Sequence, residues 1–214
     1  MTESGSSADR AAEAGSVAAH MPPVSPGRVA AVVLAAGAGT RFEGRGHKLR
    51  AEIDGTPLVR RCVDVAVDSG VGPVFVVTGS EPLADLLPPG VTEVRASDWS
   101  SGQSRSLAAA VRSLETTTVD VMVVGLADMP WVAASGWRAV AGTDSPIAVA
   151  TYGGHRRPPV RIARALWAEL PTAGDEGARD LMRSHAGLVT EVAVQGSGHD
   201  VDTVDDLGSW SPHR

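Results

Sequence analysis

A glycine-rich loop near the start of the chain contains the residues whose types and spacing suggest chemistry most directly. It covers residues 36–42 and follows the continuously apolar run 29–34. Glycines let a backbone pass close to a ligand and present successive N–H groups to phosphate oxygens. Arg41 within the loop and Lys48 shortly after it add positive charge. This combination predicts a binding site for a phosphorylated ligand.

Three kinds of phosphate-binding loop can be compared with this segment. A P-loop has the spacing of Gly39 and Gly44, but Arg45 and Gly46 replace its lysine and hydroxyl residue. A dinucleotide fingerprint fails because Phe42 stands where its third glycine belongs. The third pattern, Leu-x-x-Gly-x-Gly-Thr-Arg with a lysine a few residues later, fits at every position. A glycine turn that binds no ligand is the structural alternative.

Two aspartates that follow predicted strands are candidate metal ligands. Asp128 comes after the apolar run 119–124, and Asp202 comes after the run 189–194. Magnesium is bound in proteins by one or two carboxylates together with substrate phosphates. Helix capping is the alternative role for both aspartates, and Asp200 is the nearest competitor of Asp202.

Strands and helices alternate along the chain as in an α/β domain. Strands are predicted at residues 29–34, 74–78, 91–95, 119–124, 147–151 and 189–194, with a short alternating segment at 49–53. Helices are predicted at residues 57–69, 83–87, 103–114, 132–140, 162–170 and 176–185, with a short one after Thr203. This order predicts one α/β domain with a single doubly wound, mostly parallel sheet flanked by helices. Its loops would meet at one ligand-binding edge.

The composition restricts the kinds of partner. A net charge of −6 and 4% aromatic residues argue against a nucleic-acid surface or an anionic membrane surface. No stretch approaches the ~18 apolar residues of a membrane span, so we expect a cytoplasmic protein. The single cysteine, Cys62, cannot form an internal disulfide and is expected to be buried. Residues 1–27 lack hydrophobic periodicity and a signal sequence, and they are expected to be a disordered N-terminal tail.

The loop and the segments that follow it resemble the molybdenum cofactor nucleotidyltransferases, and they look most like the cytidylyltransferase branch. The resemblance runs from Val29 to Leu207, and residues 34–41, 47–49 and 53–59 carry its first part. Further matching segments are residues 99–107, 127–130, 174–179 and 200–203. The resemblance implies that residues 28–214 form a nucleotidyltransferase domain with a Rossmann-like fold.

The family resemblance also implies a reaction, namely in-line attack on the α-phosphorus of a nucleoside triphosphate with release of pyrophosphate. Such transfers depend on positioning and charge neutralisation. The implied catalytic residues are Arg41 and Lys48, which would hold the β- and γ-phosphates, and Asp128 and Asp202, which would bind Mg²⁺. The implied nucleotide-binding residues are Leu34, Ala35, Ala36, Gly37, Gly39, Thr40, Arg41, Lys48, Gly102 and Ser106. For Gly102 and Ser106 the alternative is a helix N-terminus capped by Ser104 or Ser106.

The base and the acceptor are also implied by the resemblance. Residues 35–37 read Ala-Ala-Gly, as in the cytidine enzymes, whereas Ala-Gly-Gly is typical of the guanosine enzymes, so CTP is the expected substrate. The family usually carries Gly-His-Pro-Val in its acceptor half, but residues 156–160 read Arg-Arg-Pro-Pro-Val. The implied acceptor is molybdopterin, and the implied recipient of the product is a molybdenum hydroxylase. Three alternatives stay open: guanylyl transfer to the same pterin, transfer to another phosphorylated acceptor, and a nucleotide-binding chaperone that inserts the cofactor without turnover.

Overall fold

The computed structural model describes residues 28–44 and 46–208, so the expected tail at residues 1–27 lies outside the described residues. The strands are β1 Val29–Ala35, β2 Glu52–Ile53, β3 Thr56–Pro57, β4 Val74–Thr78, β5 Thr92–Arg95, β6 Val121–Leu126, β7 Ile147–Tyr152, β8 His155–Ala163 and β9 Val189–Ala193. The α-helices are α2 Leu58–Asp68, α3 Gln103–Glu115, α4 Ala134–Ala141 and α5 Ala178–Ser184. Short 3₁₀ helices cover Lys48–Arg50, Ala84–Leu86, Trp99–Ser101, Arg164–Glu169, Ala186–Leu188 and Asp205–Leu207.

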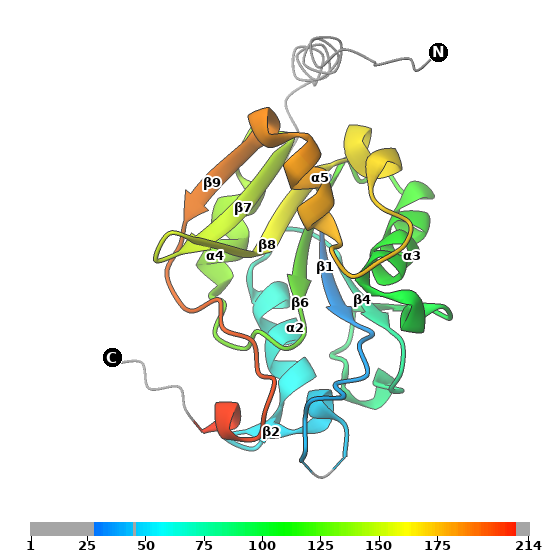
Figure 1. The fold of residues 1–214 in the computed structure, drawn as a ribbon, viewed down its shortest axis with the longest axis vertical. Helices are drawn as coiled ribbons and strands as arrows, with labels where there is room; N and C mark the ends of the chain where they lie inside the picture. Colours follow the sequence, from blue (N-terminus) through cyan, green and yellow to red (C-terminus); the bar gives the residue numbers. More distant parts are fainter. Residues whose placement is uncertain (1–27, 45, 209–214) are drawn as a thin grey trace, which may run out of the picture.

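Seven of these strands form one sheet in the order β5-β4-β1-β6-β8-β7-β9 (Figure 1). The pairs among β5, β4, β1 and β6 are parallel, and so is the pair of β7 and β9. β8 runs antiparallel to both of its neighbours. The structure therefore confirms the predicted α/β fold with a mostly parallel sheet flanked by helices.

β1 shows why continuously apolar runs form the centre of this sheet. Val33 and its alternate neighbours face a core made with α2 and α4, whereas Val32 and its alternate neighbours face a second core made with α3 and α5. Every residue of β1 is buried, because helices cover both faces of the sheet. Cys62 lies in the first core as a small buried side chain, as expected, and burial raises the pKa of its thiol.

β8 corrects the sequence-based assignment, which left residues 155–161 unassigned and placed residues 162–170 in a helix. In the structure Ile162 is a buried residue of β8, and only Arg164–Glu169 turn into a 3₁₀ helix. The strand begins with exposed, charged residues and contains Pro158 and Pro159, which are atypical of a strand inside a sheet. The two prolines fit because the pairing of β7 with β8 shifts register between Val149 and Ala150.

Parallel strands bring distant loops to one edge of the sheet. Leu34 near the end of β1 pairs with Val77 of β4 on one side and with Leu126 of β6 on the other. The loops that follow these three strands therefore lie side by side, below the β1 and β6 arrows in Figure 1. In the described part of the chain, every helix is too short or too polar to span a membrane.

Candidate active site

Lys48 joins two aspartates that are far apart in the sequence. Its Nζ donates to Asp128 Oδ2 at 2.8 Å and to Asp202 Oδ1 at 3.2 Å. The other carboxylate oxygen of Asp202 accepts from Arg41 Nη1 at 2.7 Å. The four predicted catalytic residues thus form one cluster of two cations and two carboxylates, located at the end of the glycine-rich loop.

The cluster keeps Lys48 charged although its side chain is buried. Burial alone would lower the pKa of the ammonium, but the carboxylates of Asp128 and Asp202 outweigh that effect and raise the pKa above its ordinary value. Arg41 is different because four fifths of its side chain is exposed (80%). Arg41 is therefore free to turn toward a ligand, whereas Lys48 is fixed in place.

Gly39 allows the loop to pass over Lys48. Its φ of +62° is in the left-handed region that favours glycine. A β-carbon at this position would lie 2.9 Å from Lys48 Cβ, closer than side chains normally approach. The second glycine of the motif is thus required both by the turn and by the packing of the lysine.

His47 and Ser80 hold the loop, and the sequence reasoning did not identify either role. His47 Nδ1 accepts from the Leu49 N–H at 3.2 Å, which leaves Nε2 to donate to the Gly37 carbonyl at 3.1 Å. Ser80 Oγ donates to the same carbonyl at 2.9 Å. Burial lowers the pKa of His47, and the charge of Glu81 offsets only part of this decrease. The neutral form of His47 is therefore favoured. The position of His47 next to Lys48 could have suggested a role in the site, but no sequence spacing identifies the Gly37 carbonyl as its hydrogen-bond partner.

Neither aspartate of the cluster caps a helix. α4 begins six residues after Asp128, at Ala134, and its start has no side-chain cap. Beyond Asp202, Asp206 is the residue that binds backbone groups. Its carboxylate accepts from the N–H of Asp202 at 2.9 Å and from that of Thr203 at 2.7 Å. These bonds with Thr203 and Asp202 lower the pKa of Asp206, and they fix the turn that presents Asp202.

A cavity of about 610 Å³ surrounds the cluster. With the exception of Ala35, which is buried in β1, all of the predicted site residues line it. The other lining residues were not predicted: Ala38, Trp99, Ser100, Gln103, Leu126, Asp175 and Asp200. Asp202, rather than its competitor Asp200, is the carboxylate that contacts Lys48.

The start of α3 forms another wall of this cavity. Gly102 precedes the helix with a φ of +106°, and a β-carbon there would lie 2.5 Å from the Gly174 carbonyl oxygen. The first helical N–H, that of Gln103, donates to Asp175 Oδ1 at 3.3 Å, and the Ser104 N–H donates to the Gly174 carbonyl at 3.0 Å. The predicted alternative, capping by Ser104 or Ser106, is therefore wrong, because a distant loop caps this helix.

The donor set of the cluster fits a hard divalent cation. Asp128 Oδ1 is buried and has no hydrogen-bond partner among the residues that the structure describes, so this oxygen can accept a further ligand. No group of three or more His, Cys, Asp or Glu side chains suited to a metal occurs within residues 28–44 and 46–208. Magnesium and related ions commonly take only one or two carboxylates and complete their coordination with substrate phosphates and water. Asp128 and Asp202 would hold such an ion.

Two curated proteins are similar to part of this chain. The purine catabolism protein PucB of Bacillus subtilis is 32% identical over 114 residues, which cover 51% of this chain and 56% of PucB. The bifunctional protein GlmU of Anaeromyxobacter dehalogenans is 32% identical over 118 residues, which cover 52% of this chain and 24% of GlmU. The chain thus spans only about half or less of the length of these relatives.

Solved structures are similar over most of the chain. The homologue of Rv0371c from Mycobacterium sp. strain JC1 is 28% identical with a TM-score of 0.74, over 85% of this chain and 96% of that chain. Rv0371c of Mycobacterium tuberculosis in complex with manganese is 27% identical with a TM-score of 0.70, over 85% and 99%. A nucleotidyl transferase from Methanothermobacter shares the fold, with 23% identity and a TM-score of 0.66 over 78% and 87%.

The family model for the MobA-like NTP transferase domain matches residues 31–189, which include the glycine-rich loop, Lys48 and Asp128. This match covers well over half of the chain. The chain therefore belongs to the MobA-like NTP transferase family.

Proposed function

We propose that the protein transfers CMP from CTP to molybdopterin in a Mg²⁺-dependent reaction that releases pyrophosphate. The observation that carries this proposal is the contact of Lys48 with Asp128 and Asp202 beside a glycine-rich loop. Phosphoryl and nucleotidyl transfers require cations around the triphosphate and carboxylates for a metal ion. The cluster places both within a single cavity.

The charge balance of the cluster explains why a nucleotide and a metal would bind together. Lys48 and Arg41 already balance the charges of Asp128 and Asp202. A triphosphate that engages the two cations leaves the two carboxylates in need of a new counter-ion, which a divalent cation supplies. The manganese complex of Rv0371c supports the use of such a cation.

Each residue of the cluster then has a defined task. The loop amides near Gly37 and Gly39 face the phosphates, and Lys48 binds the β- and γ-phosphates and neutralises the leaving pyrophosphate. An ion held by Asp128 and Asp202 supplies further neutralisation of the phosphate charge. His47 acts indirectly, because its bond to the Gly37 carbonyl keeps the loop in its binding conformation.

The choice of CTP rests on Ala36. This residue lines the nucleotide cavity and is 3% exposed, and its methyl group lies next to Gly79. A β-carbon at Gly79 would lie 2.7 Å from Ala36 Cβ and 2.7 Å from Trp99 Cβ, so the wall is tightly packed at this point. A methyl group in a tight wall reduces the space for a purine more than for a pyrimidine.

An adjoining cavity supports an acceptor with an apolar body. It has a volume of about 640 Å³ and shares Leu34 and Leu126 with the nucleotide cavity. Aliphatic side chains form one wall of it, and such a wall favours an acceptor with an apolar fused-ring body. A molybdenum hydroxylase is the proposed recipient of the product.

Pyrophosphate release tests the proposal. Purified protein is incubated with CTP, GTP, ATP or UTP, with and without molybdopterin and with Mg²⁺ or EDTA. We expect release with CTP only when molybdopterin and Mg²⁺ are both present. Asp128→Asn should lower the rate by roughly 100-fold, equal to about 3 kcal/mol, while the protein stays folded. Release with GTP alone would replace the cytidylyl assignment by the guanylyl one, and tight CTP binding without release would favour a chaperone.

A further inference from the structure

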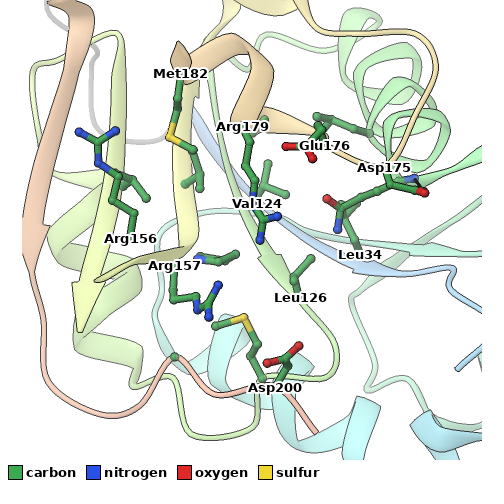
Figure 2. A pocket seen from close by; sticks show the side chains of 18 of the residues that line it. Leu34, Val124, Leu126, Arg156, Arg157, Asp175, Glu176, Arg179, Met182 and Asp200 are labelled. Atoms are coloured by element: carbon green, nitrogen blue, oxygen red, sulfur yellow. Dashed lines mark hydrogen bonds between the residues drawn. The ribbon is translucent and has the colours of Figure 1, made fainter. Parts of the chain in front are cut away.

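The cavity beside the nucleotide site has an aliphatic wall and an arginine-rich rim. Figure 2 shows it between β8 and α5, with Val124 and Leu126 of β6 at its centre. The larger apolar lining residues are Leu34, Leu107, Val124, Leu126, Met129, Val149, Val160 and Met182, and Pro158, Ala178 and Ala186 complete the apolar lining. Four arginines also line it: Arg156, Arg157, Arg179 and Arg183. Because Asp175, Glu176 and Asp200 line the same cavity, the question is which of the arginines a carboxylate already neutralises.

Two of these arginines are already neutralised by the fold. Arg156 pairs with Glu191 at 2.7 Å and points away from the cavity in Figure 2. Arg183 pairs with Asp180 and with Glu176, the latter at 3.3 Å. These ion pairs leave neither side chain available as the primary ligand of an anion.

The other two arginines, Arg157 and Arg179, are not neutralised. Among the described residues, neither guanidinium has a hydrogen-bond or ion-pair partner. Figure 2 shows both side chains reaching into the cavity, Arg157 from β8 and Arg179 from α5, so that they point toward one another. Three carboxylates line the same cavity: Glu176 binds Arg183, Asp175 accepts from the Gln103 N–H, and Asp200 forms no hydrogen bond or ion pair with either arginine among the described residues. Two unpaired guanidinium groups thus converge above an apolar wall.

Gly198 holds Arg157 in this position. A β-carbon at Gly198 would lie 2.8 Å from Arg157 Cβ and 2.7 Å from Tyr152 Cδ2, so only glycine lets the chain pass this closely. The Tyr152 hydroxyl donates to the Pro158 carbonyl at 3.2 Å and fixes the residue that follows Arg157. Close packing therefore fixes the base of the Arg157 side chain.

We infer that Arg157 and Arg179 bind the phosphomonoester group of the acceptor, while the apolar body of the acceptor lies on the aliphatic wall. The inference rests on the proposed nucleotidyl transfer. Guanidinium forks match phosphate oxygens in bidentate geometry, and two forks from opposite sides balance a dianion. An oxygen of the bound phosphate attacks the α-phosphorus, a new P–O bond forms, the bond between the α-phosphorus and its bridging oxygen breaks, and pyrophosphate leaves. The arginines permit this approach because they offset the repulsion between two anions.

Calorimetric titration with phenyl phosphate tests the arginine pair. The protein is first saturated with Mg²⁺ and α,β-methylene-CTP, which fills the nucleotide half and cannot transfer its nucleotidyl group. We expect Arg157→Gln and Arg179→Gln each to weaken phenyl phosphate binding at least about tenfold. The matched controls Arg156→Gln and Arg183→Gln remove the same charge from already paired side chains, so they should change binding less than about threefold. Equal losses in all four variants, or no loss in any, would overturn the inference.

Two further measurements are needed. One separates the position of Arg157 from its charge, and the other separates the anion site from the proposed nucleotidyl transfer. Gly198→Ala keeps the charge but displaces Arg157, so it should weaken phenyl phosphate binding as Arg157→Gln does; unchanged binding would contradict the role of Arg157. All variants should bind α,β-methylene-CTP like the wild type. The wild type could fail to bind that nucleotide while Arg157→Gln and Arg179→Gln still bind phenyl phosphate more weakly than the wild type does. That result would support the anion site and refute the proposed cytidylyl transfer.

Discussion

At the scale of single residues, the site depends on a lysine that binds two carboxylates. Lys48 is buried and retains its charge because Asp128 and Asp202 raise its pKa. A buried ammonium between two carboxylates cannot be lost without leaving uncompensated charge in the fold. Its position is therefore fixed before a ligand arrives, and in the proposed complex this reduces the entropy lost when the triphosphate binds.

Substitution of Lys48 should weaken the binding of nucleoside triphosphates more than that of monophosphates. In the proposed complex Lys48 binds the β- and γ-phosphates, which CMP lacks. We expect Lys48→Ala to weaken CTP binding about 10- to 100-fold, the range of one hydrogen bond to a charged group, and to change CMP binding less than about threefold. Calorimetric titration of both nucleotides at fixed Mg²⁺ measures the difference, and a melting curve checks that the variant is folded. Equal losses for CTP and CMP would refute the assigned contact.

Ala36 should control the choice of base. Ala36→Gly removes the methyl group from the packed wall beside Gly79 and is expected to lower the ratio of kcat/KM for CTP over GTP about tenfold. Ala38→Gly is the matched control, because it adds the same backbone freedom to the same loop at a half-buried position. An unchanged ratio in Ala36→Gly, or an equal change in Ala38→Gly, would show that the methyl group is not the selector.

At the scale of elements, the parts predicted well are those whose pattern is local. β1, β4 and β6 are continuous apolar runs, and burial on both faces of the sheet requires this pattern. The rule that parallel strands end at one edge was enough to expect Asp128 close to the glycine-rich loop. β8 was not predicted because its first residues are charged and exposed and two prolines follow them. Only after the register shift are its side chains buried.

Contacts between distant segments set the limit of prediction at the site. Lys48 and Asp202 are 154 residues apart in the sequence, so no local sequence pattern predicts their contact. Asp202 reaches the lysine because the final segment pairs with the loop after β6, where the Val201 N–H donates to the Asp128 carbonyl at 2.8 Å. The orientation of Arg157 likewise depends on Gly198, which is 41 residues further along the chain. Such contacts follow from the assembled fold rather than from any one segment.

The loop anchored by His47 should respond to pH. Burial lowers the pKa of His47 below 6.5, so the unfolded chain binds more protons than the folded one as the pH falls toward 6 and below. The contribution of His47 to stability is therefore present above about pH 6.5 and is lost as the pH falls through its lowered pKa. We expect the free energy of unfolding in urea to decrease more between pH 7.5 and 5.5 for the wild type than for His47→Gln. That variant keeps a donor for the Gly37 carbonyl without titrating, and identical pH dependence in the two proteins would rule out this role.

At the scale of the whole molecule, the nucleotide cavity joins segments from most of the chain. Its lining comes from the loops after β1 and β6, the start of α3, the 174–177 loop and the final segment. The strands that carry most of these loops share one sheet and two cores, so global unfolding also destroys the cavity. A ligand in this cavity is thus linked to the global unfolding equilibrium.

Ligand binding should for this reason raise the melting temperature of the whole domain. A ligand that binds only the native state stabilises it by about 2.7 kcal/mol when present at 100 times its Kd. For a domain of this size, each kcal/mol corresponds to roughly 2–4 °C, so CTP with Mg²⁺ should raise the Tm by about 5–10 °C. GTP, ATP and UTP at the same concentration should give smaller shifts. CTP with EDTA should lose most of its effect, because the divalent cation that Asp128 and Asp202 would hold is then removed. The CTP shift of Lys48→Ala, measured against the Tm of that variant without ligand, should be smaller because the variant lacks the proposed contact to the β- and γ-phosphates. Equal shifts with all four nucleotides, or a CTP shift that persists fully in EDTA, would mean that the cavity selects neither the base nor the metal complex.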